Sequence, residues 1–231
     1  MNDHGLAQSA APRLEIEVYS DIVCPWCYIG KRRLEGALDQ LEPSAQRQAN
    51  RVIWRPFELN PTMPRQGMDR QVYLEAKFGG PEALRSMQER VAAVGAKEGI
   101  SFAFDRILRT PNTFNAHRLI WHAERQKKQD DVVEALFHGY FIDGLDIGDL
   151  ETLVSIAQHS NLDGADTRRF LQSHDGEVAV REEQGRGHRL GIRAVPHFVL
   201  NERLAISGAQ PVEALRAAIE QVTNGSGITR G

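Results

Sequence analysis

Two cysteines stand two residues apart in the stretch Cys24-Pro25-Trp26-Cys27, and they are the only cysteines among 231 residues. A pair at this spacing can close a small disulfide and reopen it, and a position at the start of a helix favours the thiolate over the thiol. The spacing therefore predicts thiol-disulfide redox chemistry. Half of a zinc site and a pair of inert buried thiols stay open as alternatives.

A zinc site would need further ligands, and the sequence contains no second cysteine pair. His117 and His122 are five residues apart, which is about 140° around a helix. The other histidines are scattered along the chain. We therefore expect no metal and favour the redox interpretation.

A strand and a helix are predicted on either side of the cysteines. Upstream, Leu14, Ile16 and Val18 alternate with two glutamates, which is the period of a strand. Downstream, small and apolar residues recur at the spacing of an amphipathic helix, namely Cys27, Gly30, Leu34, Ala37, Leu38 and Leu41. Pro25 then lies in the first helical turn, where its missing N–H costs nothing.

The whole composition is that of a globular protein with an ordinary core. A net charge of -3 gives no basic face for nucleic acid. The apolar runs are too short to cross a bilayer, so no membrane association is expected. The first six residues lack the basic start and apolar segment of a secretory signal, which predicts a cytoplasmic location. A permanent disulfide is not expected there.

The rest of the chain separates into a helical middle and a mixed end. Residues 51–57 read as a second strand that Pro56 ends or confines to a sheet edge, so strand, helix and strand should form a parallel pair. Helices are predicted from Pro81, after Pro111, from Asp130 and over 149–159, with a short extended run at 102–104. A polar helix over 176–190, a hairpin turning at Asn201-Glu202 and a helix from Pro211 follow.

The chain resembles the DsbA-like superfamily, and most closely its FrnE-like branch, which is related to 2-hydroxychromene-2-carboxylate isomerases and kappa-class glutathione transferases. The blocks that carry the resemblance are Ser20 to Gly30, Trp54 to Pro61, Pro111 to Thr113 with Ala116-His117, Val195 to Val199, and Ser207 to Pro211. The resemblance implies an α/β thioredoxin-like fold with an inserted all-helical domain. The thioredoxin-like domain would be residues 14–60 and 176–223, the insert 61–175, and the flexible tails 1–13 and 224–231.

The family resemblance also assigns roles to residues. It implies that Cys24 is the nucleophile that forms mixed disulfides, that Cys27 is the buried resolving thiol, and that Pro196 is a cis-proline facing both. A cis-proline leaves the backbone of Val195 free to pair with an extended peptide beside Cys24. Pro25 and Trp26, between the cysteines, are expected to contact substrate.

Further substrate contacts are predicted outside the cysteine stretch. Related glutathione-dependent enzymes use an asparagine in the region of Asn60. Asn112 and Thr113 either cap a helix or face the cysteines from the insert. Ser207 and Gly208 precede a helix N-terminus, a place able to hold a carboxylate such as that of glutathione.

The chain departs from DsbA at two positions that matter for the chemistry. DsbA itself has a histidine where Trp26 stands, so a strongly oxidising potential is not expected here. Thioredoxin and DsbA carry a buried acid six residues before the nucleophile, where this chain has Val18. Asp21 and Glu58 are the candidates to replace that acid as proton acceptor for Cys27.

The sequence is compatible with three functions. The first is a cytoplasmic thiol-disulfide oxidoreductase or isomerase of the DsbA-like type, acting on protein or small-molecule disulfides and thiols. The second is a glutathione-dependent isomerase or transferase, whose relatives usually carry serine in place of Cys24. The third is a redox-switched, peptide-binding holdase. No bound cofactor is expected, glutathione is a candidate substrate or reductant, and the helical insert is a candidate surface for a homodimer.

Overall fold

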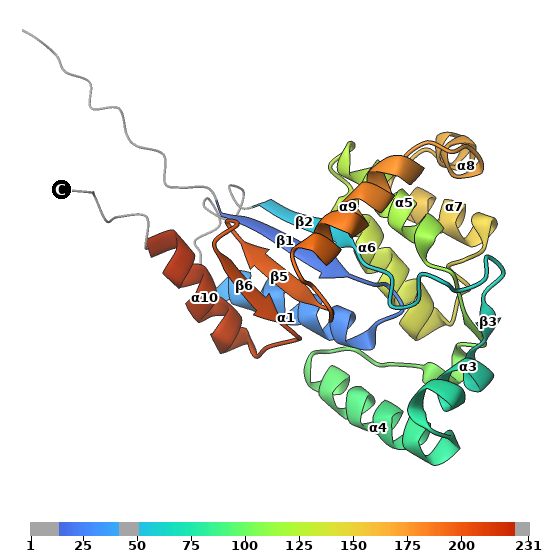
Figure 1. Ribbon diagram of the computed structural model, residues 1–231, viewed down its shortest axis with the longest axis horizontal. Coiled ribbons are helices and arrows are strands. Elements are labelled where there is room, and N and C mark those ends of the chain that lie inside the picture. Colours follow the sequence, from blue (N-terminus) through green and yellow to red (C-terminus); the bar gives the residue numbers. More distant parts are fainter. Residues whose placement is uncertain (1–13, 42–50, 225–231) are drawn as a thin grey trace, which may run out of the picture.

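The computed structural model describes residues 14–41 and 51–224. The elements follow the predicted order along the sequence, in which a largely helical middle separates the first two strands from the last two (Figure 1). The elements of the first half are β1 (Glu15–Ser20), α1 (Pro25–Leu41), β2 (Arg51–Pro56), β3 (Met68–Asp69), α3 (Arg70–Phe78), α4 (Pro81–Lys97), η1 (Phe104–Arg106) and β4 (Arg109–Thr110). Those of the second half are α5 (Phe114–Glu124), α6 (Gln129–His138), the π-helical turn η2 (Gly139–Asp143), α7 (Leu150–His159), α8 (Gly164–Gln172), α9 (Glu177–Arg189), β5 (His197–Leu200), β6 (Leu204–Ser207) and α10 (Val212–Asn224).

A four-stranded mixed sheet with the order β2-β1-β5-β6 forms the centre of the molecule. β1 runs parallel to β2 and antiparallel to β5, and β5 and β6 form an antiparallel hairpin. Pro56 ends β2 at the edge of the sheet, as predicted, where its missing N–H breaks no ladder. This strand order, with α1 between the two parallel strands, is the predicted α/β thioredoxin-like fold.

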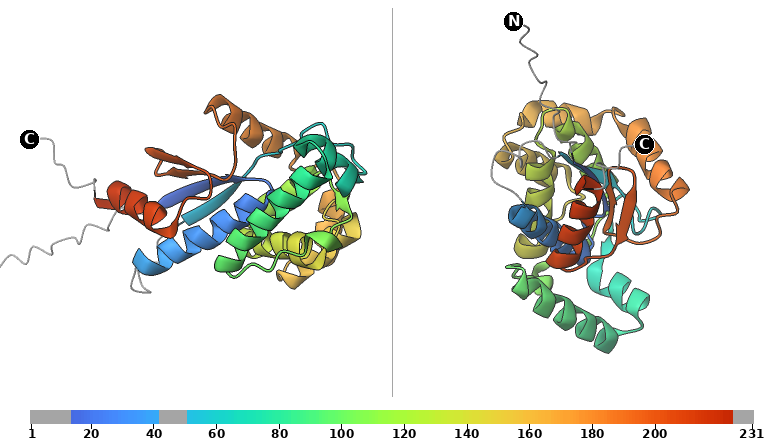
Figure 2. Two further views of the ribbon diagram at one scale, coloured as in Figure 1. Left: turned by 90° about the horizontal axis from the view of Figure 1, so that it is seen from below. Right: turned by 90° about the vertical axis from the view of Figure 1, so that its left-hand side faces the viewer.

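Helices cover both faces of this sheet. In the left-hand view of Figure 2 the sheet lies between α9 on one side and α1 with α10 on the other. Because side chains alternate along a strand, Glu17 and Val18 of β1 point to opposite faces. Val18 belongs to the apolar core on the α1 side, whereas Glu17 binds Arg186 of α9.

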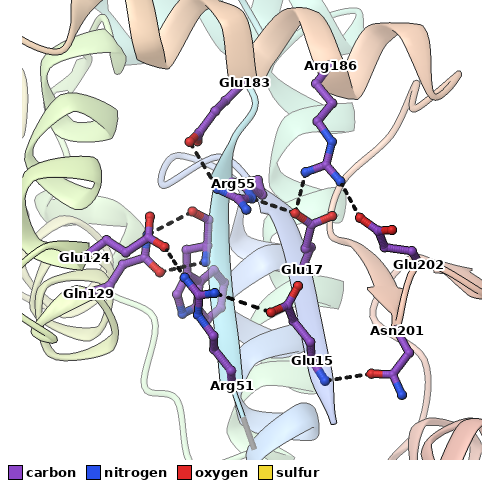
Figure 3. A network of polar contacts seen from close by, with 11 residues as sticks. Glu15, Glu17, Arg51, Arg55, Glu124, Gln129, Glu183, Arg186, Asn201 and Glu202 are labelled. Atoms are coloured by element: carbon purple, nitrogen blue, oxygen red, sulfur yellow. Dashed lines mark hydrogen bonds and ion pairs between the residues drawn. The ribbon is translucent and has the colours of Figure 1, made fainter. Parts of the chain in front are cut away.

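The carboxylate of Glu17 is buried in the middle of a polar network under α9 (Figure 3). It accepts hydrogen bonds from Arg186 and from Arg55 of β2, whose Nε lies 2.9 Å away. Arg55 also reaches Glu183 of α9, at 3.1 Å. Burial by itself would raise the pKa of Glu17, but the two guanidinium groups outweigh it and hold that pKa below the ordinary 4.5. The network fastens α9 to the sheet.

The outer edge of β2 is closed by one side chain of the insert. Gln129 begins α6, and its buried amide lies against the backbone of Trp54. Its Oε1 accepts from the Trp54 N–H at 2.9 Å, and its Nε2 donates to the Trp54 carbonyl at 3.1 Å. The amide thus makes the two hydrogen bonds that a neighbouring strand would make.

The helical insert has two parts. Helices α5 to α8 pack on one another, and α5 and α6 also contact β2. Helices α3 and α4, here called the α3–α4 arm (residues 70–97), form a separate pair that contacts α1 through α4 (Figures 1 and 2). The short β3–β4 ladder pairs Met68 with Thr110 at the base of the arm. One continuous apolar core nevertheless joins the insert to the sheet.

Three details differ from the sequence prediction. Helices α3 and α8 are not predicted, and the extended run expected at 102–104 is wrong. Phe102 and Phe104 instead stack on each other, with ring centroids 5.0 Å apart, and both rings pack against Phe141, so the short apolar run fills the core as a turn.

The predicted tails and the loop after the first helix fall largely outside the described residues. This applies to residues 1–13, 43–50 and 225–231. The predicted tail 224–231 begins one residue too early, because Asn224 is the last residue of α10.

Candidate active site

The two cysteines lie at the junction between β1 and α1. A tight turn leads into the helix, in which the N–H of Cys24 donates to the Asp21 carbonyl and the N–H of Cys27 donates to the Cys24 carbonyl, both at 3.0 Å. Cys24 immediately precedes α1, and Pro25 is its first residue, as the sequence indicates. Both thiols are free, Cys24 being 5% exposed and Cys27 fully buried.

The surroundings of Cys27 keep it protonated. Burial raises the pKa of Cys27 well above its ordinary 9.0, and the neighbouring Cys24 raises it further. The buried side chain of Ser20, at the end of β1, partly opposes the rise. Cys27 therefore stays a thiol at neutral pH until a base removes its proton.

Pro196 stands opposite the cysteines at the entrance to β5. The Val195–Pro196 peptide bond is cis, and the thiol of Cys24 lies 3.8 Å from the Val195 carbonyl oxygen, to which it donates. Gly30 of α1 allows this approach, since a Cβ atom there would come within 2.8 Å of the Pro196 ring. The chain thus brings Val195 next to Cys24 from 171 residues away.

Cys24 opens onto a cavity of about 210 Å³ between the thioredoxin-like sheet and the α3–α4 arm. Much of its lining is apolar and comes from residues 59–63, the α3–α4 arm and η1. These apolar side chains are Leu59, Met63, Leu74, Phe78, Met87 and Phe104. The polar side chains include Asp21, Asn60, Arg70, Tyr73, Lys77, Thr113 and Tyr140. The cavity can hold a partly apolar group with a few polar atoms next to the Cys24 sulfur.

Several of the residues predicted to contact substrate line this cavity. They are Pro25, Trp26, Asn60 and Thr113. Asn112 does not line it, because its amide donates to the Met63 carbonyl at 2.7 Å and accepts from the Phe114 N–H. It holds the loop around Met63 to the start of α5.

Ser207 and Gly208 do not line the cavity either. Ser207 ends β6, and the N–H of Gly208 donates to the Pro196 carbonyl at 2.8 Å. Their loop therefore supports the cis-proline from behind.

Of the two acids considered as proton acceptors, Asp21 is the one in the cavity wall. It is 1% exposed, its Oδ2 accepts from the Leu59 N–H at 2.8 Å, and its Oδ1 lies 3.5 Å from Nε2 of the buried His117. Glu58 accepts a hydrogen bond from Gln184 of α9 instead.

Sequence reasoning missed the contribution of the α3–α4 arm and η2 to the cavity. Arg70, Tyr73, Lys77 and Tyr140 all reach it. No sequence pattern ties these residues to Cys24, because they lie 46 to 116 positions further along the chain and only the tertiary fold brings them together.

The described residues contain neither a cluster of metal-ligating side chains nor a membrane-spanning helix. No group of three or more His, Cys, Asp and Glu side chains there is arranged to hold a metal ion. None of the helices in residues 14–41 and 51–224 has the length and apolarity needed to cross a bilayer.

A larger groove of about 710 Å³ lies away from the cysteines, between α1, α6 and α7. Its walls are strongly charged, and the buried Lys31 at its base is paired with Glu35, Asp130 and Glu134. Cys24 lines the smaller cavity and does not line this groove.

The chain is similar to known proteins over most of its length. The model of the DSBA-like thioredoxin domain family matches residues 15–220. The crystal structure of a probable DsbA oxidoreductase, SCO1869 from Streptomyces coelicolor, has 31% sequence identity and a TM-score of 0.83, with 94% of this chain and 92% of that chain covered.

More distant structures share the fold. 2-Hydroxychromene-2-carboxylate isomerase is 15% identical with a TM-score of 0.66, covering 94% of this chain and 100% of its own. The cytosolic disulfide reductase DsbM from Pseudomonas aeruginosa, solved with GSH, is 18% identical with a TM-score of 0.64, covering 91% of this chain and 99% of its own.

Proposed function

The chain belongs to the DSBA-like thioredoxin domain family, and from this membership and its cysteine pair we propose that it is a cytoplasmic thiol-disulfide oxidoreductase. The active pair is Cys24 and Cys27, which cycle between dithiol and disulfide. Support for the compartment comes from the structural neighbour DsbM, which is a cytosolic disulfide reductase. The protein's substrates are disulfides or thiols, with glutathione as a candidate small-molecule partner.

The reaction begins at Cys24. Its thiolate attacks one sulfur of a substrate disulfide, the substrate S–S bond breaks, and the leaving sulfur departs as a thiolate that takes up a proton. The product is a mixed disulfide between Cys24 and the remaining half of the substrate. An extended substrate can pair with the backbone of Val195 during this step, since the Val195 carbonyl already lies beside the Cys24 sulfur.

Cys27 completes the cycle. Once deprotonated, it attacks the Cys24 sulfur, expels the second substrate thiolate and leaves a Cys24–Cys27 disulfide. Two further thiols, or one dithiol, must then reduce that disulfide and are themselves oxidised to a disulfide, or the same steps run in reverse and oxidise a substrate dithiol. The observation that carries the proposal is the free cysteine pair at the start of α1, with the Val195–Pro196 bond facing Cys24.

Cysteine variants test the proposal. Cys24→Ser should abolish disulfide exchange, and Cys27→Ser should accumulate a mixed disulfide on Cys24 that mass spectrometry detects. The reduction potential of the wild-type pair, titrated against glutathione ratios, should lie between about -180 and -270 mV. Retained exchange in Cys24→Ser, or thiols that never pair over this range, would refute the assignment.

A second function is favoured by the fold shared with 2-hydroxychromene-2-carboxylate isomerase. A glutathione-dependent isomerase or transferase activates the thiol of bound glutathione and needs no cysteine pair. A Cys24→Ser, Cys27→Ser protein that still turns over an electrophile with glutathione would support this function, and loss of all activity in that variant would favour the oxidoreductase.

A further inference from the structure

Arg70 differs from the other cations buried in the described residues. Arg118 donates to the carbonyls of four residues and to the side chain of Asn115, and Lys31 is paired with carboxylates. Arg70 is 7% exposed, yet its one side-chain hydrogen bond in the described structure runs from Nη1 to the phenol oxygen of Tyr140, at 2.7 Å. Its Nε is buried and has no hydrogen-bond partner there.

The partner phenol does not neutralise Arg70. Burial raises the pKa of Tyr140 to about 12 even with the Arg70 charge beside it, so the phenol stays protonated. Its oxygen accepts from Arg70, and its O–H lies 3.3 Å from the Arg109 carbonyl, to which it donates. The rings of Tyr140 and Phe104 lie 5.6 and 5.8 Å from the guanidinium carbon. These rings stabilise the cation, but they supply no negative charge.

Arg70 and Cys24 line the same cavity. Asp21 is the one carboxylate among the lining residues, and it already accepts from Leu59 and faces His117. Lys77, which is exposed on the same arm, adds a second positive charge to the lining. The cavity wall therefore carries more positive than negative charge, and a buried cation without an ionic partner is costly.

We propose that Arg70 binds a carboxylate of the molecule whose sulfur reacts with Cys24, so that the site selects small disulfides and thiols that carry a carboxylate. A guanidinium can form two parallel hydrogen bonds with a carboxylate, which suits the unfilled donors of Arg70. The cavity volume of about 210 Å³ suits one half of a small disulfide better than a folded protein segment. This inference rests on the proposed oxidoreductase function and names its substrate class.

The exchange step itself is unchanged by this contact. The Cys24 thiolate bonds to one sulfur of the disulfide, that S–S bond breaks, and the other half leaves as a thiolate that is then protonated. The carboxylate keeps its charge throughout and acts only as an anchor. Arg70 is thus a residue that determines specificity.

Two disulfides that differ mainly in charge test the inference on the whole chain, with an excess of a dithiol present to reduce the Cys24–Cys27 disulfide after each turnover. Dithiodipropionate carries a carboxylate on each half, and hydroxyethyl disulfide carries a hydroxyl instead. Wild-type protein should show a kcat/KM about tenfold or more higher for dithiodipropionate, mainly through a lower KM. Arg70→Gln should bring the ratio of the two kcat/KM values close to one, and Arg70→Lys should retain part of the preference.

The ratio within each variant cancels a general loss of activity or folding. Arg85→Gln is the matched control, because it removes a positive charge from the same arm at a residue that does not line the cavity. It should keep the wild-type ratio. Should Arg70→Gln itself fail to fold, propionate must still inhibit wild-type reduction of hydroxyethyl disulfide competitively.

Different results would contradict the role of Arg70 and the proposed oxidoreductase function. Equal kcat/KM values for both disulfides in the wild type, or an unchanged ratio in Arg70→Gln, would overturn the role of Arg70 and leave the oxidoreductase standing. No reduction of either disulfide by the wild type would overturn the proposed function instead.

Discussion

At the scale of single residues, the site separates its two sulfur atoms by environment. Cys24 faces the cavity and the Val195 carbonyl, whereas Cys27 is fully buried and its pKa is raised by burial and by Cys24. The first sulfur is placed to meet a substrate and the second is held back as a thiol. The raised pKa of Cys27 also makes the stability of the reduced protein depend on pH.

Because the pKa of Cys27 is higher in the folded than in the unfolded protein, ionisation favours unfolding. The stabilising effect of the protonated thiol is fully present below the ordinary pKa of 9.0 and is lost as the pH rises through the higher folded value. Urea denaturation of the reduced protein between pH 8 and pH 10 should show this loss. A reduced Cys27→Ala variant should lack that component, and an identical pH dependence in both proteins would contradict the burial of an ionisable thiol.

We predict that Asp21 accepts the proton of Cys27, because its carboxylate is buried and its backbone forms the turn that leads into the cysteines. Asp21→Asn keeps an oxygen for the Leu59 N–H but cannot take up a proton, so release of the second thiol from the mixed disulfide should slow by tenfold or more, on the order expected for loss of a general base. Rapid-quench measurement of the mixed disulfide gives this rate. Glu58→Gln is the matched control, since Glu58 lies outside the cavity lining, and it should leave the rate unchanged.

The sequence was enough to find the cysteine pair and the proline opposite it, but not the whole cavity. A cysteine pair at the start of a helix has a signature in residue types and spacing, and Val195-Pro196 has one in the family pattern. Arg70 and Tyr140 have none, because a buried arginine and a buried tyrosine look like surface and core residues until the fold brings them to one wall. Long-range packing, rather than local pattern, determines those positions.

At the scale of elements, helix α1 packs closely against Pro196, and Gly30 is the residue of the helix at this contact. A Cβ atom at Gly30 would lie 2.8 Å from the Pro196 ring and 3.3 Å from Phe198. Gly30→Ala should therefore lower the free energy of unfolding by about 1–3 kcal/mol through overpacking, in spite of the better helix propensity of alanine. It should also slow exchange, because the loop that holds Val195 must shift.

Gly36 of the same helix provides the control for that substitution. There a Cβ atom would meet Val212 at 3.4 Å, an ordinary van der Waals contact. Gly36→Ala should stabilise the protein by about 0.5–1 kcal/mol. Equal effects of the two alanines in urea denaturation would show that the approach of α1 to Pro196 is not tight.

The attachment of α9 to the sheet depends on the charge of Glu17. Its pKa is held below 4.5 by Arg186 and Arg55, so its stabilising effect is present above that value and is lost as the pH falls through the folded pKa. At pH 7, Glu17→Gln should cost about 1–3 kcal/mol of unfolding free energy. The difference from the wild type should shrink in acid. Glu15→Gln, whose partner Arg51 is half exposed, should cost less than about 0.5 kcal/mol.

The helices that the sequence did not predict share a physical cause. The buried face of α8 consists of Gly164, Thr167, Phe170 and Leu171, so only two of its inward residues are large and apolar. The buried residues of α3 are Arg70 and Leu74. A hydrophobic period cannot reveal a helix whose inner face carries glycine, threonine or arginine.

At the scale of the whole molecule, one apolar core runs from the sheet into the helical insert. The insert and the thioredoxin-like part should therefore unfold together, in one transition. Trp54 in β2 and Trp121 in α5 report on the two parts. In each of two variants, one of these tryptophans is kept, and the other and Trp26 are replaced by phenylalanine. In each variant, the midpoint of unfolding followed by tryptophan fluorescence should equal the midpoint followed by far-UV circular dichroism. An earlier transition at Trp121 would mean that the insert unfolds separately.

The glutamine that closes β2 also limits how these molecules can aggregate or assemble. Growth of a fibre by strand addition requires two open sheet edges on every copy, one to receive a strand and one to offer it. In the part of the chain that the structure describes, Gln129 already uses the N–H and carbonyl of Trp54, which a strand arriving at β2 would need. Within the four-stranded sheet, a joined sheet would then have to form at β6, and pairing two β6 strands uses that edge in both copies. Self-association through the strands of this sheet should therefore stop at dimers.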